Sequence, residues 1–233
     1  DEKGRIDIKV DKENSLISIT DNGIGMTEEE VENYITKIAF SGAEDFIEKY
    51  RDKAESDYGI IGHFGLGFYS AFMVSDLVTV ESKSVDSDKA YCWKSKGVSG
   101  YSIEPCEKEE IGTKITLQIK EDSEEEKYSQ FLESYTIQEI IKKYSDYIRY
   151  PIKMMIEHSK LKEGSKDEYE TVWEEETVNS MIPLWKKAKK DITEEEYNDF
   201  YSSKFFDYDK PLKTIHTSVE GNVSYQALLY IPG

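Results

Sequence analysis

The sequence predicts an α+β fold in two unequal units. Strand-like apolar runs dominate the first 120 residues, with helix-period runs between and after them. Aromatic residues make up 12% of the 233 residues, which indicates a packed core because disordered chains are poor in them. The stretch 159–170 is charged and nearly free of aliphatic residues, and we interpret it as a linker. The predicted units are therefore 1–158 and 171–233.

The first unit begins with a predicted β-hairpin, because apolar residues alternate over 6–10 and return over 16–19. Thr27 then suits a helix N-cap. Three glutamates follow it in the first turn, and Glu30 completes a capping box. Apolar residues at helical spacing extend this predicted helix to Ile38.

The remaining elements follow from the same two periods. Further helices are predicted over 43–50, 68–74, 137–148 and 193–204. Strands are predicted over 77–82, 90–94, 101–104, 114–120, 151–157, 170–176, 214–219 and 223–231. The polar segment 51–58 is predicted to be a loop.

The formal net charge of −18 excludes some classes of partner. Binding of nucleic acid is not expected, since phosphate contacts need clusters of Lys and Arg. A site for one nucleotide is not excluded, because net charge does not describe a local cradle. The longest apolar stretch, Gly65–Val74, is too short to span a bilayer, and we expect no membrane partner.

The few cysteines and histidines suggest neither a disulfide framework nor a metal site. Cys92 and Cys106 are too few for a disulfide framework in a chain of this length, so a reducing, cytoplasmic location is expected. His63, His158 and His216 are scattered without the spacing of zinc ligands. The chain starts without Met and stops directly after a strand-like run, so we expect it to be a piece of a longer protein.

A first candidate motif is Asp-Asn-Gly-Ile-Gly-Met at 21–26. Gly23 and Gly25 would let a flat ring approach the backbone, and Asp21 could accept a hydrogen bond from the exocyclic amine of adenine. Met26 would supply an adaptable apolar wall. The alternative is an ordinary turn between a strand and a helix, where Asp, Asn and Gly are favoured.

A second motif is the glycine-rich segment 59–70. Gly62, Gly65 and Gly67 could direct backbone N–H groups at an anion just before a helix N-terminus. The same glycines suit a hinge, and we expect the polar stretch between Gly42 and Gly62 to form a lid. The alternative is close helix packing. A base pocket followed by a phosphate loop is the natural order for a nucleotide site.

The pair Gly112-Thr113 heads a predicted strand and is unremarkable by itself. It gains meaning only if that strand lies beside Asp21.

These motifs together resemble the ninety-kilodalton heat-shock chaperone family, most nearly its bacterial type. The resemblance covers nearly the whole chain in order, and the segment 61–74 is its most specific part. It is carried by the segments 21–26, 38–42, 61–74, 112–113, 150–152, 192–201 and 216–221.

The resemblance implies a Bergerat (GHKL) ATPase domain, an α/β sandwich with helices on one face of a mostly antiparallel sheet, followed by the beginning of an α/β middle domain. Asp21 takes the adenine-binding position, with Thr113 supporting it. The glycines and apolar residues that match the family's nucleotide contacts are Gly23, Gly25, Met26, Gly62, Gly65, Gly67 and Phe68. The implied partners are ATP and ADP, unfolded or partly folded client proteins, and a second copy of the longer protein.

Parts of the family's machinery are missing from this sequence. The resemblance places the general-base glutamate and the asparagine that holds Mg²⁺ before Asp1, and an arginine that reaches the γ-phosphate after Gly233. We therefore expect no catalytic residue here and essentially no ATP hydrolysis by the 233-residue chain. Tyr34 and Phe40 replace an asparagine and a lysine that many members carry, which leaves individual polar contacts open.

Two other functions remain open at this point. One is a sensor-kinase or topoisomerase-like ATPase domain on the same fold, which the segments beyond the linker disfavour. The other is a non-enzymatic interaction module in which the glycines are only structural.

Overall fold

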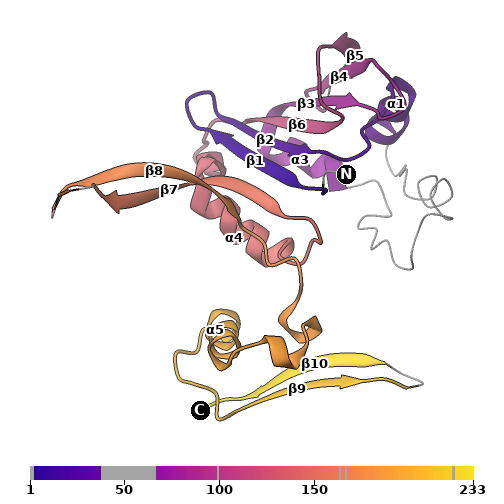
Figure 1. The fold of residues 1–233 in the computed structure, drawn as a ribbon. Helices are drawn as coiled ribbons and strands as arrows, with labels where there is room; N and C mark the ends of the chain where they lie inside the picture. The colour runs from indigo at the N-terminus through magenta and orange to yellow at the C-terminus, as the bar shows by residue number, and fades with distance from the viewer. Residues whose placement is uncertain (1–2, 38–66, 99, 163, 166, 222–223) are drawn as a thin grey trace. The chain divides into compact units, whose positions relative to one another are not determined.

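The computed structural model describes residues 3–37, 67–98, 100–162, 164–165, 167–221 and 224–233 (Figure 1). The chain divides into two compact units. The first comprises Asp1–Tyr144 and Tyr150–Val178, and the second comprises Ser145–Arg149 and Asn179–Gly233.

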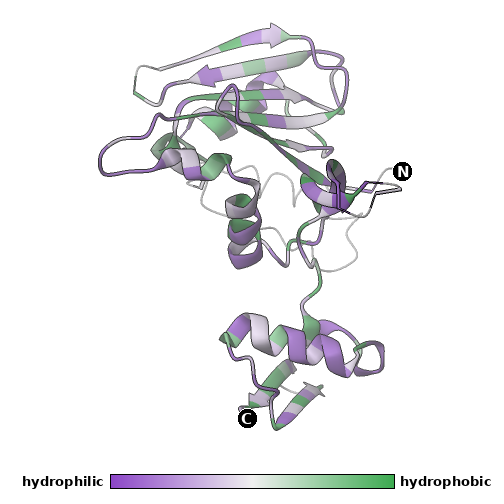
Figure 2. Ribbon diagram, turned by 90° about the vertical axis from the view of Figure 1, so that its left-hand side faces the viewer, coloured by the Kyte–Doolittle hydropathy of each residue, from purple (hydrophilic) through white to green (hydrophobic). Residues whose placement is uncertain are grey.

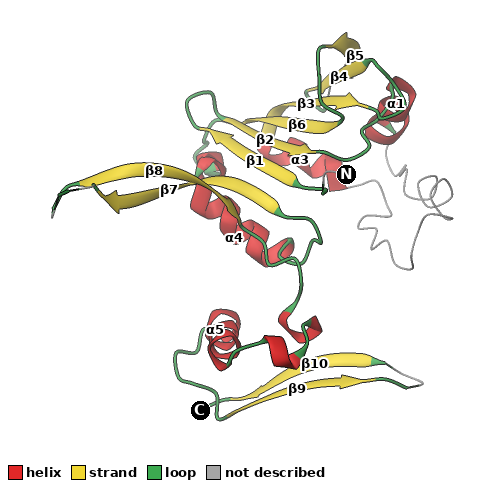
Figure 3. Cartoon of the chain, viewed as in Figure 1, coloured by secondary structure: helices red, strands yellow, loops and turns green. Residues whose placement is uncertain are grey.

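Within the described ranges the first unit holds an eight-stranded sheet of order β5-β4-β3-β6-β2-β1-β7-β8 (Figure 3). Its strands are β1 (Ile6–Asp11), β2 (Leu16–Asp21), β3 (Ser75–Lys83), β4 (Ala90–Ser95), β5 (Tyr101–Cys106), β6 (Gly112–Ile119), β7 (Ile152–Leu161) and β8 (Tyr169–Thr177). Every neighbouring pair is antiparallel except β1 and β7, which are parallel. The predicted mostly antiparallel sheet is therefore confirmed.

The helical elements of this unit cover one face of the sheet, called the inner face below. They are α1 (Glu28–Thr36), the 3₁₀ turn η2 (Gly67–Ser70), α3 (Ala71–Val74), the 3₁₀ turn η3 (Tyr128–Leu132) and α4 (Ser134–Tyr144). Two apolar clusters join helices to strands. The first is Val31, Ile35, Val78, Val80 and Trp93, and the second is centred on Ile17, Ile119 and Leu132.

Strand register explains why these residues share a face. Ile17 lies opposite Leu117, which lies opposite Val78, so each strand contributes every second side chain to the inner face. Figure 2 shows the resulting alternation of hydrophobic and hydrophilic residues along the strands. Burial of this face against helices is the main source of stability for an α+β layer structure.

The predicted capping box at Thr27 is present. Thr27 Oγ1 accepts the Glu30 N–H at 3.3 Å, and Glu30 Oε2 accepts the Thr27 N–H at 2.7 Å. Helix α1 then ends at Thr36. The predicted helix 43–50, the loop 51–58 and the lid between Gly42 and Gly62 lie outside the described residues.

Two predicted helices differ from the structure. The helix predicted over 68–74 is present in extent, as a 3₁₀ turn followed by a single α-helical turn, but it is not buried, and Met73 is 71% exposed. The chain enters β3 directly afterwards, at Ser75. The helix predicted over 137–148 ends at Tyr144, because the Asp146 carbonyl accepts the Met181 N–H at 2.8 Å within the second unit.

The segment 159–170, predicted to be a linker, is the far end of a β-hairpin. Strand β7 continues to Leu161, β8 starts at Tyr169, and these two residues lie opposite each other. Charged side chains pair across the hairpin, with Lys160 Nζ at 2.5 Å from Glu174 Oε1. The first unit thus extends to Val178.

The second unit is a small α/β arrangement within the part of the chain described. It contains the 3₁₀ turns η4 (Leu184–Lys186) and η5 (Lys189–Asp191), helix α5 (Glu194–Phe205) and the hairpin β9 (Lys213–Val219) and β10 (Tyr225–Ile231). Helix α5 packs on the hairpin through aromatic rings, with Tyr201 5.0 Å from Tyr230 between centroids. The predicted helix and hairpin of this region are confirmed.

His216 fastens α5 to this hairpin. Its Nε2 lies 3.1 Å from the Trp185 carbonyl oxygen, which can only accept, so Nε2 carries a proton. Its Nδ1 forms a hydrogen bond of 2.6 Å with the Tyr197 hydroxyl. Burial raises the pKa of Tyr197, and this keeps its hydroxyl protonated.

None of the helices in the described ranges is long and apolar enough to cross a membrane.

Candidate functional site

Three polar side chains continue the apolar rows of the inner face at one end of the sheet. Along β3, Val78 and Val80 are followed by Ser82, and Ser82 lies opposite Thr113 on β6. Strand β6 pairs in turn with β2, whose last residue is Asp21. Strand β6 therefore lies beside Asp21, which was the condition for Gly112-Thr113 to belong to the site.

The Asp21 carboxylate is oriented by backbone donors. Its Oδ1 accepts the Gly23 N–H at 2.8 Å and the Thr113 N–H at 3.4 Å. Oδ2 has no hydrogen-bond partner among the described residues. Because both donors are main-chain groups, the fold itself fixes the carboxylate and leaves one oxygen free to accept a hydrogen bond from a ligand.

Ser82 is a residue of this site that the sequence analysis missed. It is fully buried, and its Oγ accepts the Met26 N–H at 2.8 Å and lies 2.9 Å from Thr113 Oγ1. It therefore ties the segment after β2 to strands β3 and β6. A signal existed in the sequence, because Ser82 occupies an inner-face position two residues after Val80, where the strand period calls for an apolar residue.

We expect Ser82→Ala to destabilise the first unit by about 1–3 kcal/mol, because the Met26 N–H and the Thr113 hydroxyl both lose a buried partner. Urea unfolding measures the change. Ser18→Ala is the matched control, since Ser18 lies on the outer face of β2 opposite Thr116. Equal stability of both variants would show that the Ser82 hydroxyl is dispensable.

Two glycines of the site are required by close contacts between backbones. Gly25 has φ +64°, and a Cβ there would lie 1.8 Å from the Lys83 carbonyl oxygen. Gly112 has φ +119°, and a Cβ there would lie 2.2 Å from the Asp21 carbonyl oxygen. Both positions demand glycine even without a ligand. The alternative interpretation of 21–26 as a structural turn therefore accounts for Gly25, whether or not a ligand binds.

Gly23 and Gly67 differ from these two. A Cβ on Gly23 would lie 2.8 Å from Asp21 Oδ1, so glycine lets the carboxylate fold back over its own turn. Among the described residues, a Cβ on Gly67 would meet nothing within 4 Å. Close packing within the described part of the chain therefore gives no reason for glycine at 67. Gly62 and Gly65 lie outside the described residues.

Met26 and Phe68 both pack against the cluster of Val31, Ile35, Val78, Val80 and Trp93. The Phe68 ring makes an edge contact with Trp93 at 5.6 Å between centroids. The structure thus brings the predicted apolar residues to one core cluster next to the strand end that carries Asp21 and Thr113.

The described residues around Asp21 do not form a cage for Mg²⁺. One group of three or more His, Cys, Asp and Glu side chains close enough to share a metal occurs in the described ranges, and it lies on β7 and β8. Mg²⁺ prefers several oxygen ligands in octahedral geometry. Asp21 offers one carboxylate, and its Oδ1 already accepts two N–H groups. The described residues of this site therefore do not account for the binding of Mg²⁺.

Comparison with known proteins agrees with this geometry. Residues 2–125 match the family described as histidine kinase-, DNA gyrase B-, and HSP90-like ATPase, and residues 156–233 match the family described as Hsp90 protein. The chain belongs to the histidine kinase-, DNA gyrase B- and HSP90-like ATPases. The predicted α+β fold of Bergerat type is confirmed.

Within that class the chain resembles the chaperone protein HtpG of several bacteria. It is 56% identical to that of Clostridium botulinum (strain 657 / Type Ba4) over 222 residues, which are 95% of this chain and 35% of the relative. It is 53% identical to that of Oceanobacillus iheyensis and 52% identical to that of Bacillus velezensis, each over 97% of this chain and 36% of the relative. The chain thus spans about a third of the length of these relatives. The resemblance to the bacterial heat-shock chaperones is confirmed.

Proposed function

We propose that this chain is the nucleotide-binding part of an ATP-dependent chaperone of the heat-shock type. In the longer protein, ATP binding and hydrolysis to ADP would be coupled to the folding of unfolded or partly folded client proteins. The observation that carries the proposal is the Asp21 carboxylate, with Oδ1 held by two backbone N–H groups and Oδ2 without a partner in the described part of the chain.

The free oxygen would favour adenine over guanine. Adenine presents an exocyclic amine at the position where guanine presents a carbonyl oxygen, and a carboxylate accepts a hydrogen bond from the amine but repels the carbonyl. A hydrogen bond to a charged group contributes about 1.5–3 kcal/mol. Gly23 lets the backbone lie close to this carboxylate, Gly25 lets the following turn lie against the Lys83 carbonyl, and Met26 and Phe68 would provide the apolar side of the pocket.

The phosphates would meet the segment that carries Gly62, Gly65 and Gly67, where backbone N–H groups precede helical turns. Mg²⁺ would accompany the phosphates and take its main protein ligand from the longer protein. We also infer that the longer protein acts as a homodimer in the cytoplasm, without a nucleic-acid or membrane partner. The general base for hydrolysis is assigned to no residue of this sequence.

The match of residues 156–233 to the Hsp90 family favours the chaperone over a sensor kinase or a topoisomerase-like ATPase. A purely structural role of the glycines has some support, since Gly25 and Gly112 are required by backbone contacts. That interaction-module alternative does not account for the carboxylate oxygen left open at Asp21.

Titration of the 233-residue chain with ATP and with GTP tests the proposal. We expect calorimetry to show ATP binding at least about tenfold tighter than GTP binding, since about 1.4 kcal/mol is a factor of ten. Equal affinities would overturn the adenine role of Asp21. Absence of binding to either nucleotide by folded protein would favour the interaction module.

A further inference from the structure

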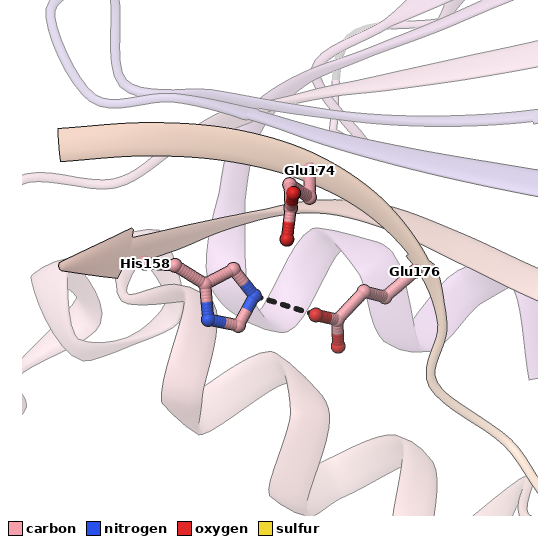
Figure 4. A group of neighbouring side chains, drawn as sticks. All are labelled: His158, Glu174 and Glu176. Atoms are coloured by element: carbon pink, nitrogen blue, oxygen red, sulfur yellow. Dashed lines mark hydrogen bonds and ion pairs between the residues drawn. The ribbon is translucent and has the colours of Figure 1, made fainter. Parts of the chain in front are cut away.

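A second group of polar side chains lies on the β7–β8 hairpin and is not part of the proposed nucleotide site. It consists of His158 from β7 and of Glu174 and Glu176 from β8 (Figure 4). One ligand atom from each residue lies within 4.8 Å of the others. His158 Nε2 and Glu176 Oε1 are 2.5 Å apart.

Strand register brings these residues together. Glu176 lies opposite Met154, Glu174 opposite Ile156, and His158 opposite Val172, so all three side chains project from the same face of the hairpin. Glu174 is diagonal to His158 across the strand pair, within reach of long side chains, and Glu176 lies two residues further along β8. The sequence analysis saw no zinc-ligand spacing around His158 because the contacts cross between strands.

The group sits where the hairpin leaves the buried part of the sheet. Met154, on the same face, is 2% exposed. The side chains of His158, Glu176 and Glu174 are 36%, 44% and 43% exposed. Water can therefore reach the group and complete a coordination shell, while the strand pair holds the donors in place.

The donors suit a divalent transition metal. One imidazole nitrogen and two carboxylate oxygens form a mixed set that Zn²⁺ accepts, with remaining positions for water. The two carboxylates of Glu174 and Glu176 outnumber the one ammonium group of Lys160 beside them, which favours a cation over an anion at this site.

Lys160 is the main competitor for such an ion. Its Nζ lies 2.5 Å from Glu174 Oε1, and Glu170 lies opposite Lys160 on the same face. The second carboxylate oxygen of Glu174 can turn to a metal while Lys160 keeps the first. A lysine at this place lowers the affinity for a cation without blocking the site.

We propose that His158, Glu174 and Glu176 form a Zn²⁺ site that clamps β7 to β8. Because the ion would bind the folded hairpin and not the unfolded chain, its binding stabilises the folded hairpin by mass action. The ion replaces the direct His158–Glu176 contact with bonds from both side chains to the metal.

Calorimetric titration of the untagged 233-residue chain with Zn²⁺ tests this. We expect one ion to bind per chain, and we expect His158→Gln and Glu176→Gln each to weaken binding by about tenfold or more, as loss of a ligand requires. Lys160→Gln should tighten binding, because it removes the competing cation. Glu157→Gln is the matched control, since Glu157 adjoins His158 but lies on the opposite face. It should bind as the unmodified chain does.

Circular dichroism of each variant shows whether it is folded, and these half-exposed positions tolerate polar replacements. If the unmodified chain binds no Zn²⁺, the three side chains form only an ion-pair cluster and the proposal fails. If His158→Gln and Glu176→Gln bind as tightly as the unmodified chain, the ion is held elsewhere, for example by Cys92 and Cys106, and the proposal fails too.

Discussion

Asp21→Asn is expected to weaken ATP binding about 10–100-fold while leaving the fold of the first unit intact. The amide oxygen of Asn can still accept the Gly23 and Thr113 N–H groups that now reach Asp21 Oδ1. The amide nitrogen then takes the place of Oδ2 and presents a donor to the donor amine of adenine. Loss of a hydrogen bond to a charged group, worth about 1.5–3 kcal/mol, gives the expected factor.

Calorimetry with ATP measures this loss, and circular dichroism with urea unfolding checks the fold. Asp7→Asn is the control, because Asp7 carries a carboxylate on the neighbouring strand β1 but forms an ion pair with Arg5. It changes the net charge by the same amount. Unchanged ATP affinity in Asp21→Asn, with the fold preserved, would remove Asp21 from the nucleotide site.

Local sequence patterns were enough to predict most elements of the fold. The hairpin of β1 and β2 follows from alternation on both sides of a polar turn. The start of α1 follows from Thr27 and Glu30, whose reciprocal hydrogen bonds need only four consecutive residues. The hairpin and the helix start depend on residues close together in the sequence, so they can be predicted without knowledge of the rest of the sheet.

The strands of the β7–β8 hairpin were predicted over 151–157 and 170–176, but its outer end was missed because it is charged on both faces. The charged composition of the segment 159–170 suggested a linker, but in the structure the charged side chains form ion pairs across the two strands. Lys153 pairs with Glu175, Lys160 with Glu174, and Lys162 with Glu168. Exposed ion pairs contribute only about 0–1 kcal/mol each. Backbone pairing from Lys153 to Leu161 therefore matters more for this strand than the composition that misled the prediction.

The site was predicted in part, for a related reason. Asp21 and Thr113 stand at strand ends flanked by glycines, which marks them in the sequence. Their contact, however, depends on β6 pairing with β2 across 92 positions. Ser82 has no marker except its place in the strand period, and its role becomes visible only once three strands are in register.

Gly25→Ala is expected to destabilise the first unit by several kcal/mol and to weaken ATP binding with it. A Cβ at this position would lie 1.8 Å from the oxygen and 2.5 Å from the carbon of the Lys83 carbonyl, so one backbone segment must move. The left-handed backbone adds about 1–2 kcal/mol for a non-glycine residue, and overlap in a packed region typically adds about 1–3 kcal/mol.

The segment cannot move freely, because both of its neighbours are bonded to β3 and to the turn that follows it. The Val85 N–H donates to the Ile24 carbonyl at 2.8 Å, and the Met26 N–H donates to Ser82 Oγ at 2.8 Å. Relief of the clash at Gly25 therefore breaks at least one of these bonds. It also displaces the turn that orients the Asp21 carboxylate, which is why stability and ATP affinity should fall together.

Gly100→Ala separates the clash from the backbone strain. Gly100 has φ +92°, at least as unfavourable for alanine as the +64° of Gly25, but a Cβ there would meet nothing within 4 Å. Urea unfolding should therefore show a much smaller loss for Gly100→Ala than for Gly25→Ala, with ATP affinity unchanged. Similar losses in the two variants would mean that backbone conformation alone selects glycine at position 25. In that case the close approach to Lys83 would not constrain the site.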